Sequence, residues 1–557
     1  MAQDKDQLTD ILDKSRKEAE ERDAQRRAIK GGHPYLNLAL IPVETEALEL
    51  IPEAKAREAK VATIEYKANN VVLVANDDKE APAQAIIKEL ESKGLKLKIF
   101  IVSLTSLQRA WDFYKYVLKK SAPITGKINI DKERIELLKE KLTKLDKVRE
   151  EILNFDYKKF PTAQILEIVL AGALANRTSD IHFESGEKAG KLRYRIDGDL
   201  RDVMTDLSPA IYSVIVSRIK LLSNLKLNIK DEAQDGRFTI NLGAKEIEIR
   251  VAIAPSEFGE VIVMRVLDPT MLSLNLSDLG LRKDDLEIVE AELKQPNGLV
   301  LNTGPTGSGK TTTLYAFLKH KHTPTIKIVT IEDPIEYHLA GIEQTQVKPE
   351  AKYTFATGLR SLMRQDPDVI LIGEVRDKET AEIAIQAALT GHLVFSTVHA
   401  NQASGAIPRF MDLGVKPTSI GPALNLIIAQ RLVKRLCPDC KTKVKLDADF
   451  KNKIEKFLNN LPARVAKKDY GDIQMYKPKG CEKCNDTGYK GRIAIYELLQ
   501  VSEEIESLMT KSGGEIEIQE FALKQGMVTI QQDGVLKMIS GITTAEEVEA
   551  LTGPLNF

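Results

Sequence analysis

The chain has 557 residues, of which 43% are hydrophobic and 29% are charged. This length and composition are typical of a soluble globular protein with several domains, and they exclude fibrous and intrinsically disordered classes. Lys and Arg (80) balance Asp and Glu (81), so the whole molecule lacks the basic field that sequence-independent DNA binding requires.

No apolar run in the sequence approaches the roughly 18 to 20 residues of a membrane-spanning helix. The charged start Met1-Ala2-Gln3-Asp4-Lys5-Asp6 is not typical of a secretory signal. We therefore expect a cytoplasmic protein without direct membrane insertion, whose membrane contact goes through a partner or a surface patch.

The first 120 residues predict a charged tail and a small α/β domain. Residues 1–33 have too few apolar side chains to form a core face. In residues 34–120, a strand over 61–66 and a strand over 71–74 flank Asn69 and Asn70, which is a hairpin signal. A helix over 85–90, a strand over 97–102 and a helix with Trp111 follow. Nothing in this unit is typical of catalysis, so we interpret it as a docking domain.

A linker is expected over residues 121–160. Within it, residues 131–155 place Ile135, Leu138, Leu142, Leu145 and Ile152 at spacings of three, four or seven among dense Lys and Glu. This spacing predicts one amphipathic helix, interpreted as a connector.

A second α/β domain is expected over residues 161–270. A helix over 163–175 precedes strands over 178–184 and 192–198, and the alternation in 247–251 predicts a strand with one wet face. Arginines on or beside these strands could bind an anion, although an ordinary salt bridge explains each of them singly.

The remaining residues, 271–557, contain the most specific motif of the chain. Gly304-Pro305-Thr306-Gly307-Ser308-Gly309-Lys310-Thr311 reads G-x-x-x-x-G-K-[ST] and stands between an apolar run and a helix-forming stretch. Glycines let backbone N–H groups converge on a β-phosphate, Lys310 can reach the β/γ oxygens, and the Thr311 hydroxyl can bind Mg²⁺. The motif predicts a nucleoside triphosphate site.

Two later apolar runs end in acidic residues. Glu332 closes the first run and Glu374 follows the second. Because ligands gather at the carboxyl ends of parallel strands, both carboxylates are expected beside the phosphate loop. We expect Glu374 to position and activate water, and Glu332 to help hold the water shell of Mg²⁺.

Two of the seven histidines flank a third apolar run. His392 precedes it and His399 ends it. A histidine on a strand is commonly structural, but this location also suits a group that senses or contacts the γ-phosphate. Both interpretations stay open at this point.

The four cysteines form two Cys-x-x-Cys pairs, Cys437 with Cys440 and Cys481 with Cys484. Four thiolates can close a tetrahedral Zn²⁺ shell, and a closed shell leaves no open position for catalysis. We expect a structural zinc element over residues 437–484, which pins the lysine-rich segment 441–480 at its base.

Taken together, the ordered motifs resemble the type IV pilus assembly and type II secretion branch of the secretion motor ATPases, the PilB/GspE family. The resemblance runs from about residue 160 to the C-terminus. It is carried by Ser179-Asp180-Ile181-His182, Gln234-Asp235-Gly236-Arg237, the phosphate loop, Glu332-Asp333-Pro334-Ile335-Glu336, Arg364-Gln365-Asp366-Pro367-Asp368, Gly373-Glu374-Val375-Arg376-Asp377, the 391–399 run and Gln430-Arg431-Leu432-Val433.

The resemblance implies a RecA-like ATPase core preceded by a smaller α/β domain. It also implies a homo-hexameric ring that binds ATP and Mg²⁺ between these two domains, and a polytopic inner-membrane platform protein as partner. Arg237 and Arg250, and more weakly Arg265, are implied as γ-phosphate contacts. ATP binding would draw the domains together, at the inner face of the cytoplasmic membrane.

Two departures from the family pattern stand out. Val261 follows Gly259-Glu260 where the family usually has arginine. The N-terminal domain matches only Leu50-Ile51-Pro52-Glu53 of relatives that bind cyclic di-GMP, so we do not predict that ligand.

Among functions, a motor for pilus assembly is slightly preferred over one for type II secretion. Retraction motors of the same superfamily usually lack the tetracysteine element and the N-terminal domain.

A ring-shaped DNA translocase is a more distant alternative, disfavoured by net charge and low aromatic content. A regulatory nucleotide-binding module without turnover is disfavoured by Glu332 and Glu374. The residues do not distinguish ATP from GTP.

Overall fold

A computed structural model describes residues 19–38, 41–67, 69–114, 127–129, 132–154, 163–242, 246–268, 274–511 and 514–556. The chain divides into two compact units, Met1–Val266 and Leu267–Phe557. Within the described ranges, no helix has the length and apolarity to cross a membrane.

The N-terminal part of the first unit contains a three-stranded sheet. Strands β1 (Val61–Lys67) and β2 (Asn70–Ala75) pair antiparallel, and β3 (Lys96–Ile101) pairs parallel to β2. Asn69, in the turn between β1 and β2, has a φ of 84°, a left-handed conformation that asparagine tolerates better than most residues. The hairpin expected from the sequence is therefore confirmed.

Helices pack on this sheet around an apolar core. They are α2 (Thr45–Leu48), α3 (Glu53–Glu58), α4 (Ala81–Ser92) and α5 (Leu104–Asp112). Trp111 on α5 is nearly buried, and its indole N–H donates to the carbonyl of Val61 at 2.9 Å. The expected charged tail lies mostly outside the described residues, but residues 19–31 are helical.

The first unit also contains a seven-stranded sheet in the order β4-β8-β9-β10-β5-β6-β7. Its strands are β4 (Lys127–Asn129), β5 (Thr178–Glu184), β6 (Gly190–Ile196), β7 (Asp199–Leu207), β8 (Gln234–Asn241), β9 (Glu246–Ser256) and β10 (Gly259–Leu267). Helices α8 (Ala163–Ala175) and α9 (Pro209–Leu222) share its core. The phenol of Tyr194 on β6 donates to the carbonyl of Val169 on α8 at 2.6 Å.

The prediction of a single connector helix over residues 131–155 is wrong. Two helices, α6 (Lys132–Lys141) and α7 (Leu145–Leu153), lie there, and both pack in the core of the seven-stranded sheet. Ile135, Val148 and Ile152 are buried in that core. The apolar spacing identified the buried face correctly. That face packs against α8, so the segment is part of the domain core and is not an exposed connector.

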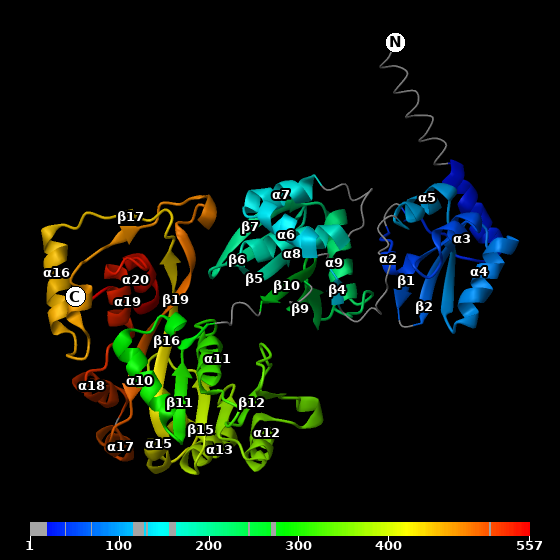
Figure 1. Ribbon diagram of the computed structural model, residues 1–557. Coiled ribbons are helices and arrows are strands. Elements are labelled where there is room, and N and C mark those ends of the chain that lie inside the picture. The colour runs from blue at the N-terminus through cyan, green and yellow to red at the C-terminus, as the bar shows by residue number, and fades with distance from the viewer. Residues whose placement is uncertain are drawn as a thin grey trace. The chain divides into compact units, whose positions relative to one another are not determined.

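The second unit is built on a seven-stranded sheet in the order β13-β12-β14-β15-β11-β16-β19. Figure 1 labels β12, β15, β11, β16 and β19 of this sheet. Its strands are β11 (Gly298–Thr303), β12 (Ile328–Glu332), β13 (Glu343–Gln346), β14 (Val369–Ile372), β15 (Leu393–Val398), β16 (Leu424–Leu436) and β19 (Tyr489–Gln500). All neighbours pair parallel except β16 and β19, which pair antiparallel.

Helices cover both faces of this sheet. Leu299 and Leu301 of β11 join one apolar cluster, and Val300 between them joins another. The first cluster includes α12 (Phe355–Leu362), α13 (Lys378–Leu389), α14 (Ala406–Asp412), α15 (Pro417–Ala423), α17 (Glu503–Thr510) and α18 (Glu515–Lys524). The second includes η4 (Leu276–Leu279), α10 (Lys283–Lys294) and α11 (Lys310–Lys321). Burial on both faces explains why the parallel strands are continuous apolar runs.

The C-terminal part of the unit adds a smaller core. It contains α16 (Ala448–Asn460), α19 (Ile530–Ile539) and α20 (Ala545–Thr552), beside the short strand pair β17 (Thr442–Lys443) and β18 (Tyr476–Lys477). A buried ion network fixes it to the start of α10: Arg282, the N-cap of α10, contacts Asp285 at 2.7 Å and Asp533 of α19 at 3.0 Å. Arg464, beyond α16, also contacts Asp285 at 2.8 Å.

Candidate nucleotide site and metal centre

The phosphate-loop residues lie between the end of β11 and the start of α11. Gly304, Gly307 and Gly309 have φ values of 147°, 80° and 90°, which side chains with a Cβ atom rarely adopt. Gly309 caps α11, and Lys310 is the first residue of that helix. The strand-loop-helix context required by the motif is therefore present.

Lys310 is folded back on the loop. Its Nζ donates to the carbonyl oxygens of Gly304 at 2.7 Å and Pro305 at 3.1 Å. Burial lowers the pKa of Lys310; Glu374 counteracts this shift, and the positive charge of Arg431 adds to it. A phosphate bound at the loop would offer Lys310 stronger acceptors than these neutral carbonyls.

Gln430 of β16 supports the loop from below. Its Oε1 accepts from the Nδ2 of Asn302 and from the hydroxyl of Thr313, each at 2.9 Å. A Cβ on Gly309 would lie 2.8 Å from the Nε2 of Gln430, so the amide packs directly under the loop. No motif in the sequence assigns a role to the Gln430 side chain, although a polar residue inside the mostly apolar run 426–433 is a signal that could have identified it.

Glu374 lies at the tip of β14, at the same sheet edge as the phosphate loop. Ile372 of β14 pairs with Ser396 of β15, and Thr303 pairs with Val398, so the residues after these strands share one edge. The Glu374 carboxylate is 13% exposed and contacts the guanidinium of Arg376 and the Nε2 of His399, the latter at 3.6 Å.

Glu332 closes the neighbouring strand β12 and is almost fully buried. It accepts hydrogen bonds from Thr330 at 2.6 Å, from the amide of Gln344 at 3.1 Å and from the phenol of Tyr315. Burial raises the pKa of Glu332, and these three donors oppose that rise. The carboxylate is thus held rigidly at the correct edge, and its role in the water shell of Mg²⁺ stays a prediction.

The two histidines lie at opposite edges of the sheet. His399 follows β15 at the edge of the phosphate loop, whereas the carbonyl of His392 accepts from Gly298 N at the far end of β11. The six residues of β11 separate these edges by roughly 20 Å. Within one chain, the structure therefore brings His399 to the candidate site and does not bring His392 there.

The three candidate arginines lie on the seven-stranded sheet of the first unit. Arg237 of β8 pairs in register with Arg250 of β9, so the two are direct cross-strand neighbours. Glu248 lies 3.9 Å from Arg237 and 3.5 Å from Arg250. The Nε of Arg265 contacts Asp180 at 3.0 Å. These arginines belong to a different unit from the phosphate loop, and their role at a nucleotide stays a prediction.

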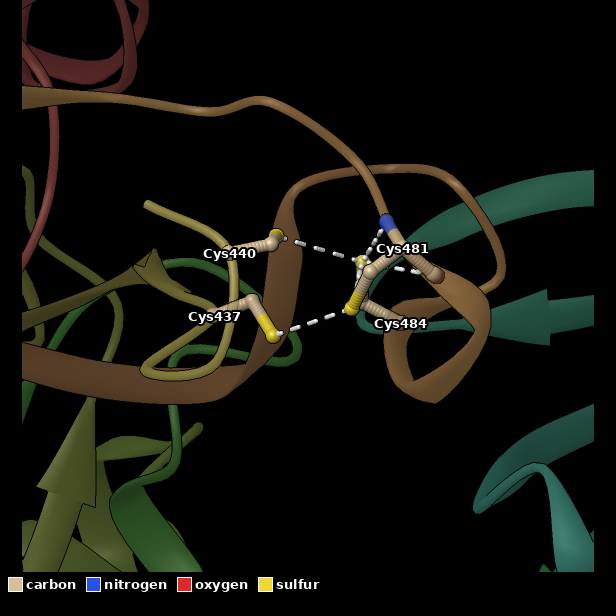
Figure 2. A group of neighbouring side chains, drawn as sticks. All are labelled: Cys437, Cys440, Cys481 and Cys484. Atoms are coloured by element: carbon tan, nitrogen blue, oxygen red, sulfur yellow. Dashed lines mark hydrogen bonds between the residues drawn. The ribbon is translucent and has the colours of Figure 1, made fainter. Parts of the chain in front are cut away.

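The four cysteines converge on one point (Figure 2). Their sulfur atoms lie within 4.8 Å of one another, with Cys437 to Cys481 at 3.9 Å and Cys440 to Cys484 at 3.8 Å. Tetrahedral geometry with Zn–S bonds of about 2.3 Å requires sulfur separations of about 3.8 Å. The N–H groups of Cys481 and Gly488 each donate to the Cys484 sulfur at 3.2 Å, and such hydrogen bonds stabilise a thiolate ligand. The geometry and donor set fit a metal.

Comparison with known proteins identifies the family. The model of the family described as "Type II/IV secretion system protein" matches residues 157–550. The chain belongs to this family. As a member of this family of ATPases with a complete phosphate loop, it is an ATP hydrolase.

Among similar proteins, the type IV pilus assembly ATPase PilB of Myxococcus xanthus is 36% identical, over 94% of this chain and 90% of its own length. The type II secretion system ATPase E of Vibrio cholerae is 42% identical, over 70% of this chain and 75% of its own length. The structure of the ATPase DotB of Yersinia pseudotuberculosis matches 71% of this chain and 95% of that chain, with a TM-score of 0.52 at 22% identity, which supports the fold.

Proposed function

We propose that this secretion-family ATPase is the motor of type IV pilus assembly. It works as a cytoplasmic homo-hexamer, peripheral at the inner face of the cytoplasmic membrane, and drives pilin polymerisation through a polytopic inner-membrane platform protein. The observation that carries the proposal is the extent of similarity. The match with a pilus assembly ATPase includes the N-terminal α/β region, whereas the matches with type II secretion ATPases cover 70% of the chain.

In this proposal the phosphate loop binds the triphosphate of ATP. Backbone N–H groups of residues 306–311 cradle the phosphates, and Lys310 exchanges the carbonyls of Gly304 and Pro305 for phosphate oxygens. Thr311 would hold Mg²⁺, with Glu332 near its water shell. When bound, Mg²⁺ neutralises charge on the phosphates.

Glu374 is the proposed general base. It positions the attacking water and accepts its proton, while His399 orients the carboxylate and senses the γ-phosphate. Arg376 already contacts the same carboxylate, so it restricts the rotamers of Glu374. A general base held at one position costs less reorganisation when the reaction occurs.

The cross-strand pair of Arg237 and Arg250, together with Arg265, is proposed to complete the ATP site in the assembled ring. A planar guanidinium neutralises charge on the transferring phosphoryl group. ATP binding would draw this sheet toward the ATPase core, and hydrolysis would release it. The tetracysteine centre is proposed to bind Zn²⁺ and to have a purely structural role, because four protein ligands leave no open position.

One experiment tests hexamer assembly and ATP hydrolysis together. Purified protein, tested with and without the cytosolic domain of the cognate platform protein, should form hexamers by light scattering and release phosphate from ATP faster with the platform domain. A protein that stays monomeric and inactive under both conditions contradicts the proposal.

Type II secretion is the second candidate, because the secretion ATPases match at 40–42% identity, above the 36% of the pilus ATPases. Deletion of the gene distinguishes the two functions. Loss of surface pili with normal exoprotein export supports pilus assembly. Retained pili with exoproteins trapped in the periplasm would support secretion instead.

A further inference from the structure

Residues 399–403, which we call the His399 loop, lie beside the base of the phosphate loop. The hydroxyl of Thr303, the residue before Gly304, donates to the carbonyl of Ala400 at 2.9 Å and accepts from the Ala400 N–H at 2.8 Å. His399 opens the loop and faces Glu374. The His399 loop is therefore hydrogen-bonded to the strand that leads into the phosphate loop.

Two side chains from β16 and β19 hold the rest of the His399 loop. Arg431 donates from Nη2 to the carbonyl of Asn401 at 3.0 Å. Glu497, which is 2% exposed, accepts from the N–H groups of Ala403 at 2.9 Å and Ile530 at 3.3 Å. The contacts to Asn401 and Ala403 are both to main-chain atoms of the loop, so they fix its path whatever its side chains do.

Arg431 is also electrostatically coupled to the phosphate loop. Burial lowers the pKa of Lys310, and the positive charge of Arg431 adds a smaller lowering. The Nη1 of Arg431 is buried and has no hydrogen-bond partner among the described residues. Both features cost free energy when no anion is present, and a phosphate at the loop would reduce the repulsion between the cations. The contact from Arg431 to Asn401 is thus placed where nucleotide occupancy can affect it.

We infer that Arg431 is a positioning residue for ATP hydrolysis, which fixes the His399 loop through the carbonyl of Asn401 and thereby sets the approach of His399 to Glu374. The inference rests on the proposed role of Glu374 as general base. Arg431 acts through the loop rather than on the reacting atoms. Its loss should therefore affect turnover more than ATP affinity.

The test compares Arg431→Ala, Arg431→Lys and the control Arg435→Ala in the full-length protein. Arg435 is an exposed arginine near the end of the same strand. Displacing a catalytic group by about 1 Å can cost about 100-fold, so Arg431→Ala should lower kcat by about 10- to 100-fold and change KM for ATP less than threefold. Lysine keeps one donor for Asn401, so Arg431→Lys should recover most of the lost kcat. Arg435→Ala should match the wild type.

Two results would overturn the inference: a kcat for Arg431→Ala within twofold of the wild type, or a large rise in KM with unchanged kcat, which would place Arg431 in ground-state ATP binding. If Arg431→Ala does not fold, Arg431→Lys decides, with the same reading of kcat and KM. Glu374→Gln is measured in parallel. Wild-type turnover by that variant would contradict the proposed function itself, whereas normal turnover by Arg431→Ala alone would contradict only this inference.

Discussion

His399 faces Glu374 across the tips of β15 and β14, with Nε2 and Oε2 3.6 Å apart. The two residues are separated by helix α13 in sequence, and parallel pairing of β14 with β15 brings them to one edge. Glu374 is mostly buried while His399 is about half exposed. This geometry lets the imidazole orient the carboxylate and still reach a ligand at the phosphate loop.

A His399→Ala variant should therefore lose turnover. We expect kcat to fall about 10- to 100-fold, within the range of a residue that orients a catalytic group, while ATP still binds. His320, exposed on α11, provides the control, and His320→Ala should keep normal activity. Steady-state phosphate release checks both variants. Equal activity of the two would show that His399 is only a surface residue.

ATP binding should be coupled to protonation of Lys310 at alkaline pH. Burial holds the pKa of free Lys310 below its usual value of about 10.4, and a bound triphosphate raises it again. At a pH between the pKa of Lys310 in the free protein and its higher pKa in the ATP complex, binding takes up a proton. ATP affinity therefore falls as the pH rises above the pKa of Lys310 in the free protein. Calorimetry with a non-hydrolysable ATP analogue over a series of alkaline pH values, in buffers of different ionisation enthalpy, measures this uptake.

The control for this experiment is Lys310→Arg. Arginine stays protonated at all accessible pH values, so its variant should bind the analogue without proton uptake from this position. Identical uptake by the wild type and by Lys310→Arg would show that another group titrates.

Gln430→Leu should destabilise the second unit. The substitution leaves the buried Nδ2 of Asn302 and the hydroxyl of Thr313 without their shared acceptor. Each orphaned donor costs about 1 to 3 kcal/mol, so the melting temperature should fall by several degrees and the phosphate loop should bind ATP more weakly. Gln500→Leu, at the exposed end of β19, is the matched control. Unchanged melting of Gln430→Leu would mean that the loop does not depend on this amide.

Metal removal should destabilise the segment around the cysteines but leave the phosphate loop able to bind ATP. Because the chain has only these four cysteines, thiol titration reports on this centre alone. We expect one Zn²⁺ per chain, no thiol reactive before chelation, four reactive thiols afterwards, and a lower melting temperature. Four reactive thiols in the untreated, metal-replete protein would exclude a closed metal shell.

The elements that the sequence predicted well are those with a local cause. The phosphate loop, the hairpin at Asn69 and the cysteine pairs each depend on residues within a few positions, and glycine or asparagine backbone preferences identify them directly. Strand tips bearing Glu332 and Glu374 were also predictable, because parallel strands place their carboxyl ends at one edge.

Other features depend on contacts between residues far apart in the chain. Arg282 and Asp533 are 251 positions apart and meet in a buried ion pair. Gln430 reaches Asn302 across 128 positions. The order of the strands sets such pairs, and no local pattern reveals that order. The same reason explains why the sequence did not place His392, because a histidine next to a strand lies at one edge or the other according to strand direction.

The central claim is that Glu374 activates water for hydrolysis of ATP bound at the phosphate loop. The most direct test is phosphate release by Glu374→Gln, with Glu382→Gln on the exposed face of α13 as control. We predict that Glu374→Gln binds ATP with near wild-type affinity but hydrolyses it at least about 100-fold more slowly, while the control is unaffected. Turnover by Glu374→Gln at the wild-type rate would contradict the account.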